Sequence, residues 1–140
     1  MSIMEGLRAY FMQCPLLDAG SRLGVDFLGT DAVEYVVESV PAEAVLQAYT
    51  DGASKRQFVF MFASREAYGS DVLQNLANSG FYESLADWME EQSGNNRFPA
   101  MPEGKMPLKI EAQTSGYLMD ADPEAGRYQI QCRLIYYQED

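Results

Sequence analysis

The chain has 140 residues, a length typical of one domain with one buried core. Its 21 acidic residues outnumber its 10 basic residues and give a net charge of −11 at pH 7. Such a surface repels phosphate backbones and anionic lipids, which excludes a nucleic-acid groove or a charged membrane patch as the leading interpretation. The N-terminal residues lack the pattern of a signal peptide, and no apolar run approaches the roughly 18 residues of a membrane span.

A helix is predicted at the start of the chain. Ser2 and Glu5 have the spacing of a capping box, and Pro15 ends the helix. The apolar residues of its buried face are Ile3, Leu7, Tyr10, Phe11 and Cys14. Cys14 and Cys132 are far apart in sequence and each lies in an apolar pattern, which favours two buried thiols in a reducing cytoplasm.

Extended segments are predicted next. Val25–Leu28 and Val33–Val40 have the composition of strands on either side of a turn at 29–31. Val45–Tyr49 is a further extended piece, and Thr50–Lys55 is predicted as a turn or a mobile loop.

The run Phe58–Ala63 is apolar at every position. It predicts a central strand that is covered on both faces, or covered on one face and used in an interface on the other. The following segment, 64–71, is typical of turn and capping chemistry rather than of a nucleophile, because no base lies nearby in the sequence.

A second helix is predicted from Ser70 and Asp71, which favour its N-terminus, to Gln92. Its apolar residues repeat every three to four positions: Val72, Leu73, Leu76, Ala77, Phe81, Leu85, Trp88 and Met89. Gly80 is placed on this apolar face, where it would allow close packing or mark a kink. We expect one long helix, with Gly80 as the position where it would bend.

Two long strands are predicted to end the chain after a loop at Ser93–Pro107. Leu108–Leu118 and Tyr128–Tyr137 alternate between apolar and polar residues, which is typical of half-buried antiparallel strands. Asp120–Gly126 connects them. The order α-β-β-(β)-β-α-β-β therefore predicts a single α+β domain over residues 1–140, a mostly antiparallel sheet with two helices packed against it.

The residue types argue against catalysis. The sequence has no histidine, the commonest general base and metal ligand. No phosphate-binding glycine motif occurs. Asp120, Asp122 and Glu124 resemble the start of a calcium loop, but Ala125 replaces the glycine and Gln131 replaces the bidentate glutamate that such a loop needs. We therefore expect no enzymatic activity, no cofactor and no metal.

Aromatic and apolar residues occur on the more polar faces of the last two strands. Tyr117, Ile135 and Tyr137 lie at such positions. Two interpretations stay open for them: packing against the core or a covering segment, and burial against a neighbouring subunit.

Three blocks of the sequence resemble a known family: LRAYFMQCPLL, YTDGASKRQFVFMFASREAYGSDVLQNLANSGFYESLADWMEEQ and GYLMDADPEAGRYQIQCRLIYYQ. They are similar to minor capsid or minor tail proteins encoded by prophages of Gram-positive bacteria. The order of elements also resembles that of the tail terminators of long-tailed phages, which form a ring, usually of six subunits, between tail tube and head.

The resemblance implies a structural protein of the virion, made in the host cytoplasm, with itself, the tail tube protein and the head-completion proteins as partners. It implies an acidic lumen through which DNA slides without sticking. The candidate interface residues are those of the 50–56 loop, the 120–126 connection and the last strands: Asp51, Lys55, Arg56, Tyr117, Asp120, Asp122, Ile135 and Tyr137.

Two other classes of function remain as alternatives. The first is an acidic adaptor or inhibitor that binds one basic protein, as a stable monomer in a one-to-one complex. The second is a small-molecule binding module or enzyme with a cleft between sheet and helix, which a ligand-dependent rise in melting temperature would reveal.

Overall fold

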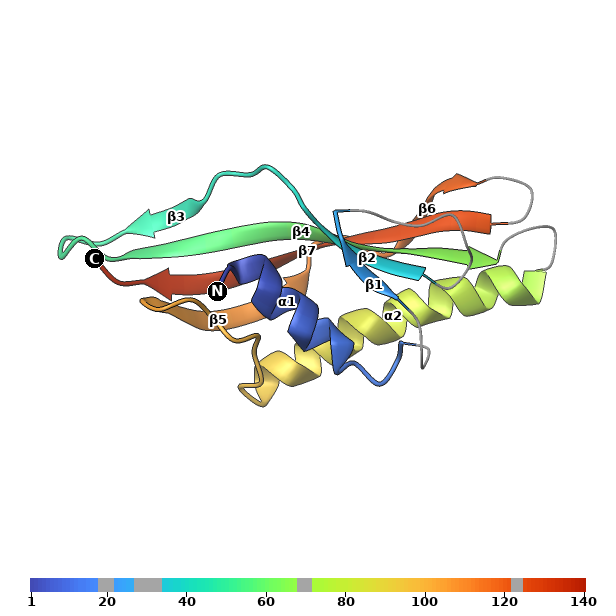
Figure 1. Ribbon diagram of the computed structural model, residues 1–140, viewed down its shortest axis with the longest axis horizontal. Helices are drawn as coiled ribbons and strands as arrows, with labels where there is room; N and C mark the ends of the chain where they lie inside the picture. The colour runs from blue at the N-terminus through green and yellow to red at the C-terminus, as the bar shows by residue number, and fades with distance from the viewer. Residues whose placement is uncertain (18–21, 27–33, 68–71, 122–124) are drawn as a thin grey trace.

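The computed structural model describes residues 1–17, 22–26, 34–67, 72–121 and 125–140, and only the backbone of residues 67 and 72–74. Along the chain it forms α1 (Ile3–Met12), β1 (Leu23–Val25), β2 (Glu34–Ser39), β3 (Val45–Ala48), β4 (Ser54–Ala67), α2 (Val72–Gly94), β5 (Lys105–Ala112), β6 (Tyr117–Ala121) and β7 (Ala125–Gln138). The fold is α+β, as the sequence predicts, with the helices packed against a mostly antiparallel sheet (Figure 1).

A ribbon of two long antiparallel strands forms the centre of the sheet. β4 and β7 pair residue by residue from Ser54 opposite Gln138 to Ala67 opposite Ala125. On the other side of β4, β2 pairs with its second half and β3 with its beginning. β5 and β6 pair in the same way with the two halves of β7. The sheet is therefore long and narrow, and its β3–β4 end extends past both helices (Figure 1).

The first helix follows its local signals. The Ser2 hydroxyl accepts a hydrogen bond from the Glu5 backbone N–H at 3.1 Å, and the Glu5 carboxylate accepts one from the Ser2 backbone N–H at 3.3 Å. This is the predicted capping box, which satisfies donors that the helix itself leaves unpaired. Leu7, Tyr10 and Phe11 are buried, so the predicted apolar face is confirmed.

The second helix is continuous through Gly80, so the structure shows no break there. Its predicted face is wrong in the first half, because Leu76 is 62% exposed while Asn78 and Tyr82 are buried. The buried face is completed by Leu85 and Met89. The predicted N-cap, Ser70 and Asp71, and the side chains of Val72 and Leu73 lie outside the described residues.

The core lies on one face of the sheet, between the strands and both helices. Phe11 of α1 packs against Phe60 and Phe62 of β4, with ring centroids 5.8 and 5.0 Å apart. From α2, Tyr82 packs edge-on against Phe62 at 6.5 Å, and Trp88 lies 4.9 Å from Tyr10. Aromatic rings at these separations bury large apolar areas and interlock the helices with the sheet.

Three predictions about strands need correction. β4 continues to Ala67, so residues 64–67, predicted as part of a turn, belong to the strand. β1 pairs with β2 in parallel, Leu23 opposite Tyr35, an arrangement that the sequence does not predict. β1 also begins earlier than predicted; the turn at 29–31 lies outside the described residues. The predicted strand Leu108–Leu118 is two strands, β5 and β6, separated at 113–116.

A close contact explains the break between β5 and β6. A Cβ atom at Gly116 would overlap the side chain of Tyr82, so only glycine lets the chain pass this close to α2. The described part of the chain forms no helix that is both long and apolar enough to cross a membrane.

Candidate functional site

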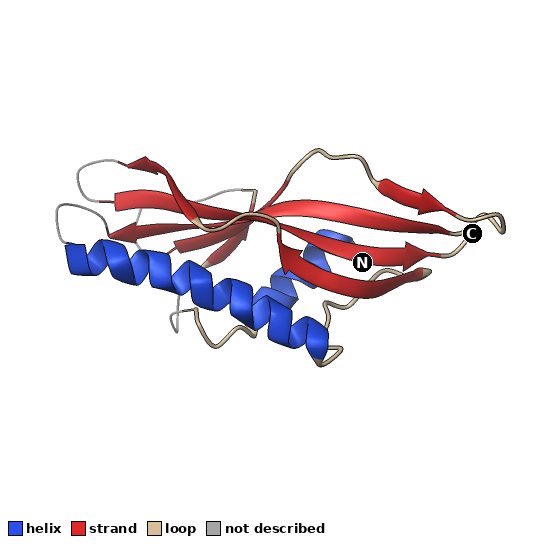
Figure 2. Cartoon of the chain, turned by 180° about the vertical axis from the view of Figure 1, so that it is seen from behind, coloured by secondary structure: helices blue, strands red, loops and turns tan. Residues whose placement is uncertain are grey.

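One face of the sheet carries neither of the described helices, and we call it the outer sheet face. It consists of the odd-numbered positions from Lys55 to Arg65 on β4 and from Arg127 to Tyr137 on β7, with their register partners on β2, β5 and β6. Both helices pack on the opposite face, against Phe62. Figure 2 shows the sheet and α2 from behind.

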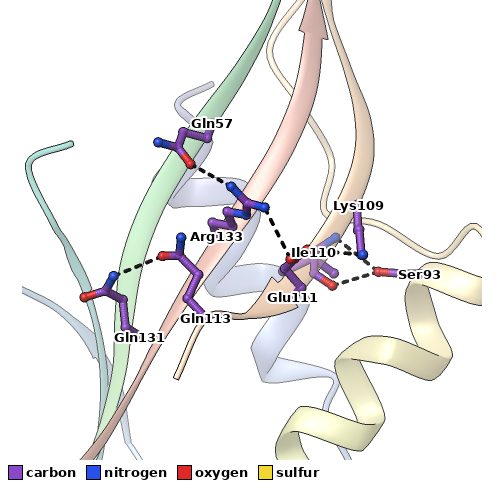
Figure 3. A network of polar contacts seen from close by, with 8 residues as sticks. All are labelled: Gln57, Ser93, Lys109, Ile110, Glu111, Gln113, Gln131 and Arg133. Atoms are coloured by element: carbon purple, nitrogen blue, oxygen red, sulfur yellow. Dashed lines mark hydrogen bonds and ion pairs between the residues drawn. The ribbon is translucent and has the colours of Figure 1, made fainter. Parts of the chain in front are cut away.

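A polar network crosses the middle of the outer sheet face (Figure 3). Arg133 of β7 donates a hydrogen bond from Nη1 to the Gln57 side chain of β4 at 3.2 Å, and its Nη2 lies 3.5 Å from the Glu111 carboxylate of β5. Lys109 also pairs with Glu111, at 3.2 Å. Beside it, the Gln131 side chain donates to that of Gln113 at 3.0 Å. The network links three strands through side chains whose positions the strand register fixes.

An ion pair between Arg127 of β7 and Glu38 of β2 crosses the same face nearer its other end. β4 lies between these strands, and the pair reaches across it where the small residue Ala63 stands. Ala63 is 0% exposed, as is its register partner Val36 of β2, although neither described helix packs on this face. The Arg127 Nε also donates to Gln129 at 3.1 Å, which in turn donates to the Tyr117 hydroxyl at 2.6 Å.

Four of the predicted interface residues lie together at the β3–β4 end of the sheet. Asp51 is in the turn, where its carboxylate accepts a hydrogen bond from the Ala53 N–H at 3.0 Å. Lys55 and Arg56 belong to β4, so the predicted loop at 50–55 is shorter than expected. Lys55 is opposite Tyr137, whose ring lies 6.2 Å from that of Tyr49. Lys55 and Tyr137 are therefore on the outer sheet face, and Arg56 is on the other.

The remaining predicted interface residues are separate from this group. Tyr117 and Asp120 lie in β6, toward the opposite end of the sheet, and Tyr117 is 43% exposed. Ile135 is on the outer sheet face but is only 7% exposed, so it offers little surface to a partner. Asp122 lies outside the described residues. Sequence reasoning thus named candidate residues toward both ends of the surface, and it did not identify the Arg133 and Arg127 contacts that lie between them.

A cleft of about 570 Å³ lies between the C-terminal half of α2 and the edge strand β5. Ser93 of α2 stands in its wall and binds the strand through its hydroxyl, which accepts from the Ile110 N–H at 3.1 Å and donates to the Ile110 carbonyl at 2.8 Å. The hydroxyl therefore binds both the N–H and the carbonyl of Ile110, the two backbone groups that point away from β7. A further strand placed beside β5 would therefore find no free backbone group at Ile110 to pair with.

The groups with shifted pKa values belong to the core. Burial raises the pKa of the Tyr82 hydroxyl, which shares a 2.7 Å hydrogen bond with Ser64 and donates one to the Tyr128 carbonyl at 3.0 Å. Burial also raises the pKa of the Cys132 and Cys14 thiols, which are not joined in a disulfide. Each group is held in its neutral form, in which it packs and forms hydrogen bonds.

Among the residues that the structure describes, no group of three or more potential metal-ligating side chains occurs. The outer sheet face instead presents charged and amide side chains in fixed positions, with exposed Tyr117 toward one end and Tyr49 at the other. A comparison of the sequence with protein-family models and with curated proteins finds no match.

Proposed function

We propose that this chain is a structural subunit of a phage or prophage virion, a tail terminator that forms a ring where the tail tube meets the head. The observation that carries the proposal is the outer sheet face, because neither described helix packs on it and exposed side chains toward its two ends, such as Tyr117 and Tyr49, are available to another subunit. The resemblance of the three sequence blocks to prophage minor capsid and tail proteins points to the same class.

Exposed apolar side chains support assembly as well. They occur on strands at both ends of the sheet, away from the core: Val45 and Leu46 in β3, Met106 and Leu108 in β5, and Tyr117, Leu118 and Met119 in β6. A ring in which each copy contacts two neighbours uses such surfaces on both sides. The proposed partners are further copies of this chain, the tail tube protein and the head-completion proteins, in the host cytoplasm during assembly and then in the virion.

The mass in solution tests the proposal. Light scattering on a size-exclusion column, over a wide range of concentrations, should give a closed oligomer, and negative-stain images should show rings with a central hole. A phage tail tube protein added to the chain should promote ring formation if the chain alone assembles weakly. A chain that stays monomeric in both experiments, or that forms a one-to-one complex with a basic protein, would overturn the proposal.

A further inference from the structure

Charge is divided unevenly between the two sides of the molecule. Five of the ten cationic side chains lie on the outer sheet face by their strand register: Lys55, Arg65, Lys109, Arg127 and Arg133. Four carboxylates of the described strands share it: Glu34, Glu38, Glu111 and Asp120. This face is thus close to neutral in a chain of net charge −11. Helix α2 has four acidic residues and no basic residue.

The acids of α2 are aligned. Glu83, Asp87 and Glu90 are exposed and follow one another at offsets of four and three residues, on the side of the helix opposite the buried Leu85 and Met89. Two residues of the first half of the helix, Leu76 and Gly80, continue the same line. We call these five residues the acidic stripe.

Two members of the acidic stripe are not explained by the fold of one chain. Leu76 is 62% exposed, a large apolar side chain turned away from its own core. Gly80 has an ordinary helical conformation, and a Cβ atom there would meet nothing within 4 Å. Glycine in mid-helix lowers stability relative to alanine, so the folded monomer gains nothing from it. What glycine does provide is room for another backbone or sheet to approach closely.

We infer that the acidic stripe of one copy docks on the outer sheet face of the next copy. The inference rests on the proposed ring and names the two surfaces that join its subunits. Cations of the outer sheet face then lie against the carboxylates of the stripe, and the helix covers a sheet face on which neither described helix of its own chain packs. The contact is heterologous, so each copy offers one surface to each neighbour, which is the arrangement that closes into a ring.

Contacts between like surfaces are less favourable. Two acidic stripes placed together bring carboxylates against carboxylates, and like charges in contact are costly. Two outer sheet faces placed together have no such repulsion, but they leave both stripes, with Leu76 and Gly80, unused. Only the pairing of an acidic stripe with an outer sheet face gives both surfaces of every copy a partner.

Reversing the charge of each surface tests the inference. The stripe variant is Glu83→Lys, Asp87→Lys and Glu90→Lys; the face variant is Lys55→Glu and Lys109→Glu, of which Lys109 has a side chain 56% exposed. Self-association is measured by sedimentation velocity, and circular dichroism and the melting temperature verify that each variant folds. We expect each variant alone to associate at least about tenfold more weakly than the unaltered chain.

An equimolar mixture of the two variants tests directly whether the acidic stripe contacts the outer sheet face. In the mixture, a basic stripe can meet an acidic face and an acidic stripe can meet a face that keeps its cations, so we expect assembly to return with the two variants alternating. The control variant Glu103→Lys and Glu139→Lys changes the net charge in the same direction as the stripe variant, at exposed positions outside both surfaces. It should leave assembly unchanged or strengthen it.

The outcomes separate this inference from the proposed function. If the unaltered chain forms rings, but the variants also form them or their mixture fails to recover, the stripe and the face are not the joined surfaces, and the ring itself stands. If the unaltered chain stays monomeric alone and with the tail tube protein, both the ring and this contact are overturned.

Discussion

At the residue scale, the hydroxyl of Tyr82 connects the core to two strands. It contacts the Ser64 hydroxyl of β4 at 2.7 Å and donates to the Tyr128 carbonyl of β7 at 3.0 Å, and Ser64 is completely buried. Tyr82→Phe removes a hydrogen-bond partner from both of these buried groups, so we expect it to lower the free energy of unfolding by about 1–3 kcal/mol in urea titrations. Tyr49→Phe, which removes a hydroxyl from a 40% exposed ring, should change it by less than about 0.5 kcal/mol. Equal losses for the two variants would contradict this role.

Buried thiols and phenols make stability depend on alkaline pH. Burial raises the pKa of Cys132 above its ordinary 9.0 and that of Tyr82 above its ordinary 10.0. Above those ordinary values the unfolded chain loses protons that the folded chain keeps, so the free energy of unfolding falls as pH rises. The free energy of unfolding should keep its full value below pH 9.0 and decline as the pH rises above it.

The decline can be assigned to Cys132 by substitution. Cys132→Ala lowers stability at every pH through the lost packing, but it should reduce the slope between pH 9.0 and 10.0 by up to about 1.4 kcal/mol per pH unit. Urea titrations at a series of pH values measure the slope. An unchanged slope would mean that the thiol titrates alike in the folded and unfolded chains.

At the scale of elements, two glycines have opposite roles. At Gly80 an added methyl group meets nothing, so Gly80→Ala should raise the free energy of unfolding by about 0.5–1 kcal/mol through better helix propensity. At Gly116 a Cβ would overlap Tyr82, so Gly116→Ala should lower it, by about 1–3 kcal/mol. Thermal and urea unfolding of the two variants test both signs, and a loss at Gly80 would show a packing role within the monomer.

Ser93 joins α2 to an edge strand and offers a further test at this scale. Ser93→Ala leaves the Ile110 N–H and carbonyl without their hydroxyl partner, and we expect a loss of about 1–3 kcal/mol and faster hydrogen exchange at the Ile110 amide. Ser84→Ala, at an exposed position of the same helix, should be neutral or slightly stabilising. Unchanged exchange at Ile110 would contradict the assignment.

What the sequence predicts at this scale follows from the range of the interactions. The capping box of α1 and the alternation of β7 are local signals, and both were predicted correctly. The parallel pairing of β1 and the exposure of Leu76 depend on packing against distant segments. Gly116 within a predicted strand was the available signal for the break between β5 and β6.

The candidate surface was predicted in part for the same reason. Tyr117, Lys55 and Tyr137 were named as candidates because aromatic and turn residues stand out in a sequence, and their role in an interface stays a prediction. Arg127 and Glu38 are 89 positions apart, and only the register of β2, β4 and β7 brings them together. A single charged residue in a predicted strand is normally interpreted as a solvated side chain. The sequence therefore carries no local signal for the contacts at the centre of the outer sheet face.

At the scale of the whole molecule, two electrostatic effects on assembly oppose each other. Copies of net charge −11 repel one another at long range, while the acidic stripe and the cations of the outer sheet face attract at short range. The screening length falls from about 30 Å at 0.01 M salt to about 8 Å at 0.15 M and about 3 Å at 1 M. Moderate salt therefore screens mainly the repulsion, and only high salt weakens the contact itself.

We expect association to strengthen from low to moderate salt and to weaken again toward 1 M, which sedimentation velocity at a series of salt concentrations measures. The stripe variant has a smaller net negative charge and lacks the favourable contact, so its weak association should show no maximum. A steady rise with salt for the unaltered chain would mean that apolar contacts hold the copies together, because burial of apolar surface is strengthened rather than screened by excluded salts. In that case Leu76 and the exposed tyrosines, rather than the carboxylates of α2, would be the residues that join one subunit to the next.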